Sequence, residues 1–211
     1  KIDIGVHSLK DLPTKLPEGL IIGAVLKRDD PNDLIMTRDK VKLIDLKKNA
    51  VVGTSSIRRA VQLKKIRPDI ELKEIRGNIE TRINKLKNGK FDAIILAYAG
   101  LKRLKIKDHY EKIDIKEMIP SPGQGVIAIV IRKHDNLLSL LKRLNDQKTS
   151  IESKCERNFL SALDGSCKTP IGALARLELK NKSKILFHYM AATSDGKKFI
   201  KDKTYFDIDN Y

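Results

Sequence analysis

The sequence changes character at Ala50-Val51-Val52-Gly53-Thr54-Ser55-Ser56-Ile57-Arg58-Arg59, where an apolar run gives way to hydroxyl side chains and then to two arginines. A short apolar run that ends at a glycine predicts a buried strand. Serine and threonine at the start of the next segment cap the free N–H groups of a helix, which we expect to reach about Ile66. The stretch therefore predicts a strand followed by a helix, with an anion site at the turn between them.

The same pattern recurs around this stretch. Residues 34–36, 70–75 and 91–97 are expected as further strands. Arg76-Gly77-Asn78 leads into a helix over residues 79–86 that carries Arg82, and Ala99-Gly100-Leu101 turns into another helix. Strands that alternate with helices predict an α/β lobe with a parallel sheet.

Four arginines are expected at one edge of this sheet, at or just after strand ends: Arg58, Arg59, Arg76 and Arg82. Cations at a helix N-terminus oppose the helix dipole and need an anion nearby, so we infer an anion-binding cleft. The alternative is that these arginines pair with surface acids. A phosphate P-loop is excluded because no glycine-rich spacing ends in Gly-Lys-Ser or Gly-Lys-Thr.

A second lobe is predicted from both sides of the first. Residues 2–6 and 20–26 are expected as buried strands, and His7-Ser8-Leu9-Lys10-Asp11-Leu12-Pro13 follows the first of them, at a strand end where α/β proteins bind ligands. Lys10 could bind an anion there and Asp11 could serve as an acid. The alternative is that Asp11 only caps a helix.

Two polar connections, at residues 27–32 and 120–125, indicate that the chain crosses between the lobes twice. Residues 126–131 then return to the first sheet. Helices are expected at residues 137–144 and 151–163, and three antiparallel strands at 171–179, 185–192 and 199–206, with turns at Asn181 and Asp195-Gly196. The predicted fold is α/β, with two lobes around a cleft, two connections that form a hinge, and a small C-terminal α+β domain with a three-stranded antiparallel sheet.

A cysteine occupies the polar turn Asp164-Gly165-Ser166-Cys167-Lys168-Thr169-Pro170. A turn would expose Cys167 and Lys168 would favour its thiolate, which makes it a candidate attachment point; the alternative is an inert core thiol. Cys155, the only other cysteine, falls in a predicted helix and is expected in the core, although a disulfide with Cys167 is arithmetically possible. The scattered histidines and two cysteines lack the spacing of a zinc site, so no metal is expected.

The formal net charge of +16 raises nucleic acid as a partner. Lysines are spread along every predicted helix, however, and aromatic residues make up only 5% of the chain, which favours a solvated surface over a base-stacking one. No apolar run reaches the roughly 20 residues needed to cross a bilayer. Because the chain opens at Lys1, inside a strand-like run and without Met, we expect an N-terminal portion to be missing.

Taken together, the motifs resemble the porphobilinogen deaminase (hydroxymethylbilane synthase) family. The resemblance rests on motifs in the same order over nearly the whole chain: His7-Ser8-Leu9-Lys10-Asp11, residues 53–59, Arg76-Gly77-Asn78 with Thr81-Arg82, residues 92–97, Pro122-Gly123-Gln124-Gly125 and Gly165-Ser166-Cys167. It implies two periplasmic-binding-protein-like lobes and a third domain. The implied domains are residues 1–28 with 125–145, residues 29–124, and residues 146–211.

The resemblance also implies the chemistry. In this family a cysteine holds a dipyrromethane cofactor by a thioether bond, and four porphobilinogen molecules are joined head to tail with loss of ammonia. It assigns the covalent anchor to Cys167 and the catalytic carboxylate to Asp11. The implied cofactor-binding residues are Ser8, Lys10, Asp11, Thr54, Ser55, Ser56, Arg58, Arg59, Arg76, Gly77 and Arg82, and the implied substrate-binding residues are Arg76, Arg82, Ala97, Gly100 and Gln124.

The family also has an N-terminal segment whose arginine and serine line the same cleft, and this sequence begins after it. The implied partner is porphobilinogen, with no nucleic acid and no membrane, and the implied state is a monomer in the cytoplasm or, alternatively, a plastid. Two other classes stay open at this point. A non-enzymatic two-lobed anion-binding protein would explain the arginines, and a nucleic-acid binder would explain the net charge.

Overall fold

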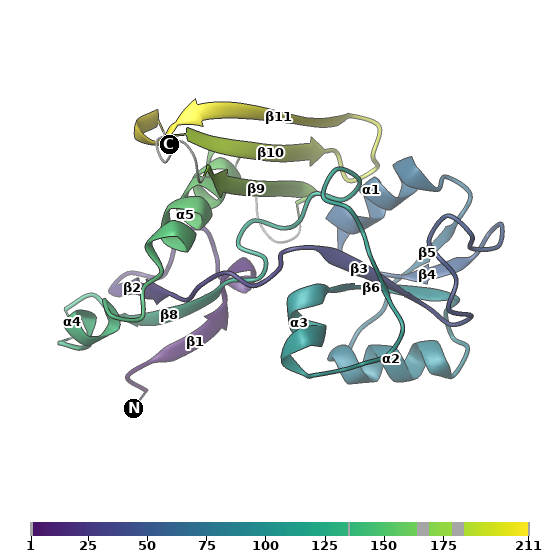
Figure 1. Cartoon of the computed structure of the whole chain (residues 1–211), viewed down its shortest axis with the longest axis horizontal. Coiled ribbons are helices and arrows are strands. Elements are labelled where there is room, and N and C mark those ends of the chain that lie inside the picture. The colour runs from purple at the N-terminus through teal and green to yellow at the C-terminus, as the bar shows by residue number, and fades with distance from the viewer. Residues whose placement is uncertain (1, 135, 164–168, 179–183, 211) are drawn as a thin grey trace.

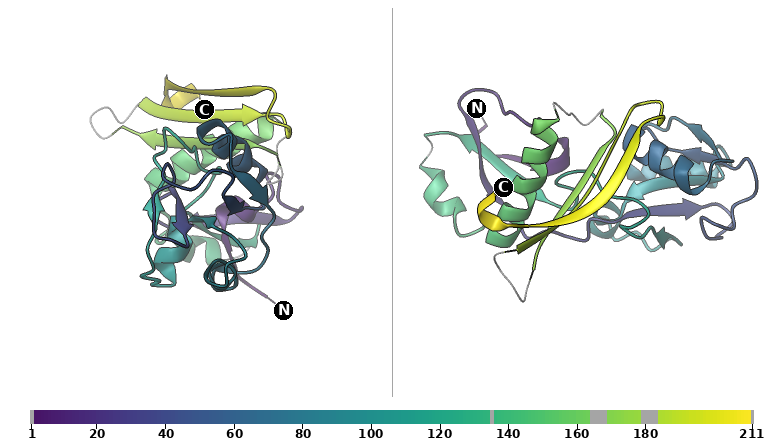
Figure 2. Two further views of the ribbon diagram at one scale, coloured as in Figure 1. Left: turned by 90° about the vertical axis from the view of Figure 1, so that its right-hand side faces the viewer. Right: turned by 90° about the horizontal axis from the view of Figure 1, so that it is seen from above.

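The computed structural model describes residues 2–134, 136–163, 169–178 and 184–210. Its described strands form three sheets, which we name A, B and C. Figure 1 shows sheets A and B side by side. Sheet C lies above sheet A and above the segments that connect the two lobes. Figure 2 gives the same arrangement from the side and from above. None of the helices in these ranges is long and apolar enough to span a membrane.

Sheet A has the strand order β1-β8-β2, with β1 at Gly5–Ser8, β8 at Ile127–Arg132 and β2 at Leu20–Val25. Both outer strands pair antiparallel with β8, in the registers Gly5↔Val130 and Leu20↔Arg132. The predicted return of the chain into the first sheet is therefore confirmed. Helix α4, Leu137–Leu141, packs Leu141 against Ala24 and Ile131.

One expectation for sheet A is wrong. Residues 2–6 were expected as a buried strand, but β1 begins only at Gly5, and Ile2 and Val6 are 78% and 64% exposed. The physical reason is position, because β1 is an edge strand in the described part of sheet A and the packing of α4 is directed at β2 and β8.

Sheet B has the order β5-β4-β6-β3-β7. Its strands are β3 at Asp33–Thr37, β4 at Val51–Gly53, β5 at Glu71–Lys73, β6 at Ala93–Ala97 and β7 at Glu111–Lys112. As predicted, β4 pairs parallel with β5 and with β6. The expectation that the whole sheet is parallel is wrong, because β3 pairs antiparallel with β6 and with β7.

Helices cover both faces of sheet B. The helices are α1 at Ile57–Ile66, α2 at Ile79–Lys87 and α3 at Tyr98–Arg103. Successive side chains of a strand point to opposite faces, so Ile35 packs with Leu63 of α1 while Leu34 packs with Leu101 of α3. The two faces of sheet B therefore pack against two separate hydrophobic clusters, which leaves the edges of the sheet for the site.

Sheet C has the order β11-β10-β9 and is antiparallel throughout, as predicted. The strands are β9 at Ile171–Leu177, β10 at Lys184–Ala192 and β11 at Phe199–Asp207, and the 3-10 helix η2 follows at Ile208–Asn210. Helix α5, Gln147–Ala162, begins where the Asp146 side chain accepts the N–H of Thr149 over 2.8 Å. It packs Cys155 into the core of sheet C, as expected.

The two connections between sheets A and B run side by side. The N–H of Leu26 donates to the carbonyl of Ile127, and the N–H of Asp29 donates to the carbonyl of Gly125 over 3.0 Å. Gly125 has a φ of +82°, and a Cβ at this position would lie 2.6 Å from the carbonyl oxygen of Asp29. Glycine is therefore required where the two connections meet.

Candidate functional site

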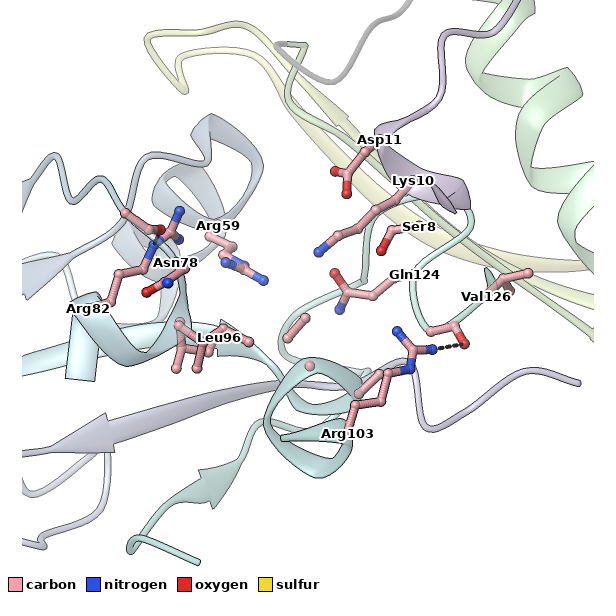
Figure 3. Close-up of a pocket in the computed structure, with 16 residues that line it drawn as sticks. Ser8, Lys10, Asp11, Arg59, Asn78, Arg82, Leu96, Arg103, Gln124 and Val126 are labelled. Atoms are coloured by element: carbon pink, nitrogen blue, oxygen red, sulfur yellow. Dashed lines mark hydrogen bonds between the residues drawn. The ribbon is translucent and has the colours of Figure 1, made fainter. Parts of the chain in front are cut away.

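A cavity of about 330 Å³ lies between the end of sheet A and one edge of sheet B (Figure 3). Its walls come from the end of β1 and the turn after it, the second connection, the end of β6, and the helices α1, α2 and α3. The lining residues are Ser8, Lys10, Asp11, Arg59, Gly77, Asn78, Ile79, Arg82, Leu96, Ala97, Ala99, Gly100, Arg103, Gln124, Gly125 and Val126. Most of the residues proposed from sequence therefore face one space.

The first wall is formed by the end of β1. The 3-10 helix η1, Leu9–Asp11, turns the chain immediately after Ser8. Leu9 is buried against Val25 and Val126, and its N–H donates to the carbonyl of Val126 over 2.9 Å. This anchor leaves Lys10 and Asp11 to project into the cavity (Figure 3).

The opposite wall begins at the N-terminus of α1, and it has the predicted cap. The Ser56 side chain accepts the N–H of Arg59, and Thr54 Oγ1 accepts the N–H of Ser56 over 3.2 Å. Ser55 Oγ donates to the carbonyl of Ile75 over 2.6 Å. Thr54 thus stabilises the turn, while Ser55 ties it to the segment that follows β5.

The anion that the two arginines of α1 require is Asp33, the first residue of β3, whose side chain is fully buried. Arg59 donates to Asp33 Oδ1 from Nε over 3.1 Å and from Nη2 over 2.7 Å. Arg58 Nη2 lies 2.8 Å from Asp33 Oδ2 and its Nη1 donates to the carbonyl of Ile119 over 2.6 Å. The acid that pairs with these arginines is therefore internal. For this pair the alternative of surface acids is wrong, and so is the argument that a bound anion must balance them.

The second connection joins the same group through Gln124. Its Nε2 donates to the carbonyl of Pro31 over 2.6 Å and to Asp33 Oδ1 over 2.9 Å. We refer to Asp33, Arg58, Arg59 and Gln124 as the Asp33 cluster. Burial alone would raise the pKa of Asp33, but the charges of Arg58 and Arg59 and the hydrogen bonds from Arg59 and Gln124 outweigh it and hold that pKa well below its usual range.

Two cations share one carboxylate in this cluster, so a net positive charge faces the cavity. A second space of about 220 Å³ adjoins it and brings in more of the proposed residues. It is lined by Lys10, Asp11, Ser55, Ser56, Arg58, Arg59, Arg82, Ser121 and Gln124. Arg58 and the α1 cap thus reach the same region as Lys10 and Asp11.

Lys10 lies between unlike charges. Burial and the positive charge of Arg59 lower the pKa of Lys10 to about 8, against the raising effect of Asp11 and Asp33. A carboxylate bound next to Lys10 would stabilise the charged form of the lysine and raise its pKa again.

The start of α2 supplies one predicted arginine to the cavity and keeps another outside it. Asn78 caps the helix by accepting the N–H of Thr81 over 2.8 Å. Arg82 Nε donates to the carbonyl of Gly77 over 2.7 Å, which aims the guanidinium at the cavity, and burial together with Arg59 lowers its pKa. Arg76 is exposed and pairs with Glu74 over 2.8 Å, and it lines neither space.

The turn from β6 into α3 completes the cavity. Ala97 and Gly100, both proposed as substrate-binding residues, line it. A Cβ on Gly100 would lie 2.6 Å from Ile79 Cδ1, so the small residue lets α2 and α3 approach each other closely. These positions shape the wall without adding charge.

Two charged residues at the site were not singled out from the sequence. Arg103, at the end of α3, lines the cavity and donates to the carbonyl of Gly125 over 3.3 Å. Asp33 was not proposed as the partner of Arg58 and Arg59. Arg103 could have been found because it follows a strand of the same sheet, where ligands bind. Asp33 could have been sought because two arginines at a helix N-terminus need an anion nearby.

Cys167, proposed as the covalent anchor, lies outside the described residues together with the rest of residues 164–168. Cys155 is buried, and burial and the neighbouring Glu156 raise its pKa to about 12. This thiol is therefore a core residue and is not a candidate for attachment at neutral pH.

The residues that line the cavity have the chemistry that a dipyrromethane requires, since its side chains are carboxylates and its rings carry N–H donors. Four cationic side chains line it: Lys10, Arg59, Arg82 and Arg103. Asp11 is a carboxylate on the opposite wall from Arg59 and Arg82 (Figure 3). Gln124, which also lines the cavity, has a buried Oε1 with no hydrogen-bond partner in the described part of the chain.

Comparison of the sequence with known protein families identifies the family of this chain. Residues 1–139 match the family model described as porphobilinogen deaminase, dipyromethane cofactor binding domain, and residues 150–210 match that of the porphobilinogen deaminase C-terminal domain. The chain belongs to the porphobilinogen deaminase family. The predicted resemblance is confirmed, and the match to two consecutive family models covers both lobes and sheet C.

Individual porphobilinogen deaminases are similar over most of the chain. That of Nitratiruptor sp. is 48% identical over 99% of this chain and 67% of its own length. That of Campylobacter concisus is 43% identical over 95% of this chain and 65% of its own length, and that of Rickettsia prowazekii is 48% identical over 83% and 60%. The chain spans about two thirds or less of the length of these curated relatives.

Among solved structures, a periplasmic binding protein of Salmonella typhimurium with high arginine specificity is similar over 65% of this chain and 59% of its own. The identity is 18% and the TM-score 0.36, which is too low to support a statement about this porphobilinogen deaminase family member.

Proposed function

We propose that the complete protein is a hydroxymethylbilane synthase, which joins four porphobilinogen molecules head to tail with release of ammonia and forms the linear tetrapyrrole hydroxymethylbilane. The observation that carries this proposal is a cavity lined by four cations and by one carboxylate, Asp11. A chain of pyrroles with acetate and propionate groups needs several cations, and its ring N–H groups need an acceptor. The cavity supplies both.

A dipyrromethane bound through Cys167 would supply the primer to which the first porphobilinogen is joined. The chain's own residues would then act on the incoming substrate. Arg59, Arg82 and Arg103, with Lys10, would bind carboxylates and hold the rings in place. Asp33 keeps Arg58 and Arg59 in fixed orientations before ligand enters, so little reorganisation is needed on binding.

Asp11 would be the catalytic residue. In each round the bond between the aminomethyl carbon and nitrogen of porphobilinogen breaks and ammonia leaves, a carbon–carbon bond forms to the terminal pyrrole, and that ring loses a proton. The carboxylate would accept the pyrrole N–H, stabilise the cationic azafulvene that forms as ammonia leaves, and take part in the proton transfer. It is exposed toward the cavity, so substrate can reach it.

The remaining proposed binding residues divide by position. Ser8, Gly77, Ala97, Gly100 and Gln124 line the main cavity, and Ser55, Ser56 and Arg58 line the adjoining space. Thr54 supports the turn between them. Arg76 would contact the growing chain only after leaving Glu74, since it is outside both spaces here.

We also propose that the domains are residues 1–28 with 125–145, residues 29–124, and residues 146–211. The strands of sheets A, B and C fall within these three units in turn. A monomer in the cytoplasm that binds neither nucleic acid nor membrane is part of the same proposal. The match of residues 150–210 to the family's C-terminal domain argues against a non-enzymatic two-lobed binding protein.

The deciding experiment is intact mass spectrometry of the complete protein, followed by peptide mapping. We expect a mass excess of two linked pyrrole units on the peptide that contains Cys167, and no adduct in Cys167→Ser. Asp11→Asn should keep the adduct but lose turnover of porphobilinogen by about a hundredfold or more. A protein that stays unmodified after incubation with porphobilinogen would contradict the proposal.

A further inference from the structure

The loop that follows Asp11 is held by a side chain from a distant helix. Residues 12–14 have no regular secondary structure. The guanidinium of Arg157, on α5, donates to three successive carbonyl oxygens: Leu12 over 3.4 Å, Pro13 over 2.6 Å and Thr14 over 2.9 Å. Three carbonyls therefore point at one planar group.

This arrangement fixes the direction of the loop as well as its position. The five N–H donors of arginine lie in one plane at fixed angles, so a guanidinium that serves three carbonyls permits few orientations of the backbone. Arg157 is half-buried, and burial lowers its pKa. Its hydrogen bonds to the described residues go to carbonyl oxygens, which makes it a clamp on the backbone of the loop.

The other end of the segment has its own anchor. Leu9 is 1% exposed and packs with Val25 and Val126. Lys10 and Asp11 thus lie between a buried leucine on one side and the loop bound by Arg157 on the other. If either anchor is released, the carboxylate of Asp11 is free to move within the cavity.

Helix α5 is itself fixed by the residue next to Arg157. Glu156 is fully buried; it accepts the N–H of Gly123 over 2.7 Å and that of Ala175 over 2.9 Å, and pairs with Arg28 over 2.8 Å. Arg28 and Gly123 belong to the two connections between the lobes, and Ala175 belongs to sheet C. Consecutive residues of one helix therefore attach the connections, sheet C and the loop after Asp11.

We propose that Arg157 is a positioning residue that sets the place of Asp11 and Lys10 in the cavity. Through it, a shift of α5 and sheet C relative to the lobes is transmitted to the catalytic carboxylate. The role of Asp11 in this statement rests on the proposed function; the clamp itself rests on the contacts of Arg157.

The first test is hydrogen exchange of the complete protein without substrate. Arg157→Met keeps the length of the side chain and removes the donors, Arg157→Lys keeps the charge, and Arg143→Met is a control at an exposed position. We expect exchange in peptides spanning residues 9–16 to rise at least about tenfold in Arg157→Met, with peptides of α2 and β6 unchanged. Arg157→Lys should lie between it and the wild type, and Arg143→Met should match the wild type.

The second test is steady-state turnover of porphobilinogen by the same proteins. A positioning role predicts that kcat falls about tenfold or more in Arg157→Met while KM stays within about threefold, with partial rescue by Arg157→Lys. Unchanged exchange at residues 9–16, or faster exchange with unchanged kcat, would overturn the proposal. If Arg157→Met does not fold, the comparison of Arg157→Lys with the wild type decides. A wild type without turnover would remove the proposed function while the exchange result still tested the clamp.

Discussion

Arg59 directs two of its donors, Nε and Nη2, to a single oxygen of Asp33, and neither side chain is more than 8% exposed. A guanidinium held in this way has little freedom to turn toward a ligand or away from it. The remaining positive charge of the arginine pair is therefore presented to the cavity from a fixed position.

Removing the charge of Asp33 should be costly. Asp33→Asn leaves Arg58 and Arg59 buried without their anion, and we expect the free energy of unfolding to fall by about 3–5 kcal/mol. The control is Asp39→Asn, which breaks an exposed pair with Arg38 and should cost less than about 1 kcal/mol. Urea titration of both variants measures the difference, and equal losses would show that the Asp33 cluster does not stabilise the fold.

Binding of porphobilinogen should weaken as the pH rises through about 8. The pKa of Lys10 is lowered from 10.5 to about 8, so the lysine loses its charge above that pH and with it the attraction for a carboxylate. We expect affinity to fall by up to about tenfold per pH unit above the pKa. Calorimetric titration of the Cys167→Ser variant, which cannot load the primer, measures binding without turnover.

Lys10→Met in the same Cys167→Ser background isolates this effect, because it leaves only the titration of the ligand itself.

The free energy of unfolding should change with pH in the opposite direction to the affinity for porphobilinogen. The folded pKa lies below the unfolded value, so between about pH 8 and 10.5 the unfolded chain holds the extra proton and the free energy of unfolding rises with pH. An affinity with the same pH dependence in both proteins would remove Lys10 from the carboxylate site.

The close approach of the two connections can be tested with a pair of glycines. Gly125 and Gly19 have φ values of +82° and +81°, but a Cβ would meet the Asp29 carbonyl only at Gly125. Gly19→Ala should cost about 1 kcal/mol from backbone strain alone. Gly125→Ala should cost about 1–3 kcal/mol more, because the clash must move one of the connections. Thermal and urea unfolding compare them, and equal costs would mean that the connections can separate freely.

Arg103 should contribute to the affinity for porphobilinogen, whereas the adjacent Lys102 should not. Arg103 lines the cavity, whereas Lys102 pairs with Asp29 over 2.8 Å outside it. Loss of one charge-assisted contact in Arg103→Met should weaken porphobilinogen binding about tenfold, and Lys102→Met should change it less than about threefold. The same titration measures both, and a larger effect at Lys102 would contradict the geometry of the cavity.

Cys155 should resist alkylation in the folded protein. Its pKa is raised to about 12, so at pH 8 only about one thiol in ten thousand is ionised. We expect iodoacetamide to modify Cys155 at least about a hundredfold more slowly than in the protein unfolded in urea, as measured by mass spectrometry of its peptide. Equal rates in the two states would show that α5 opens readily.

The strand–turn–helix units were predictable because their determinants are local. Ser56 and Asn78 cap the helices that follow them, each through a residue three positions along, and such short-range patterns can be read directly from sequence. Arg59 and Arg82 followed from the rule that ligands bind at strand ends, but the same rule selected Arg76, which lines neither space.

The failures involve distant residues. Asp33 meets Arg59 from 26 residues away and Gln124 from 91, and no local pattern selects it over other acids. The exposure of Val6 depends on which neighbours a strand acquires, a property of the sheet and not of the strand's own residues. The role of Arg157 depends likewise on a contact with Pro13 across 144 residues.

The strand order β1-β8-β2 has a consequence for how the chain folds as it is made. Within the described residues, β1 and β2 each pair with β8, which begins at Ile127. Every strand of sheet B is synthesised earlier, ending at Lys112. Because domains fold as units once their residues have left the ribosome, sheet B can close first. The pairing of β1 and β2 with β8 must then wait until the second connection has been translated.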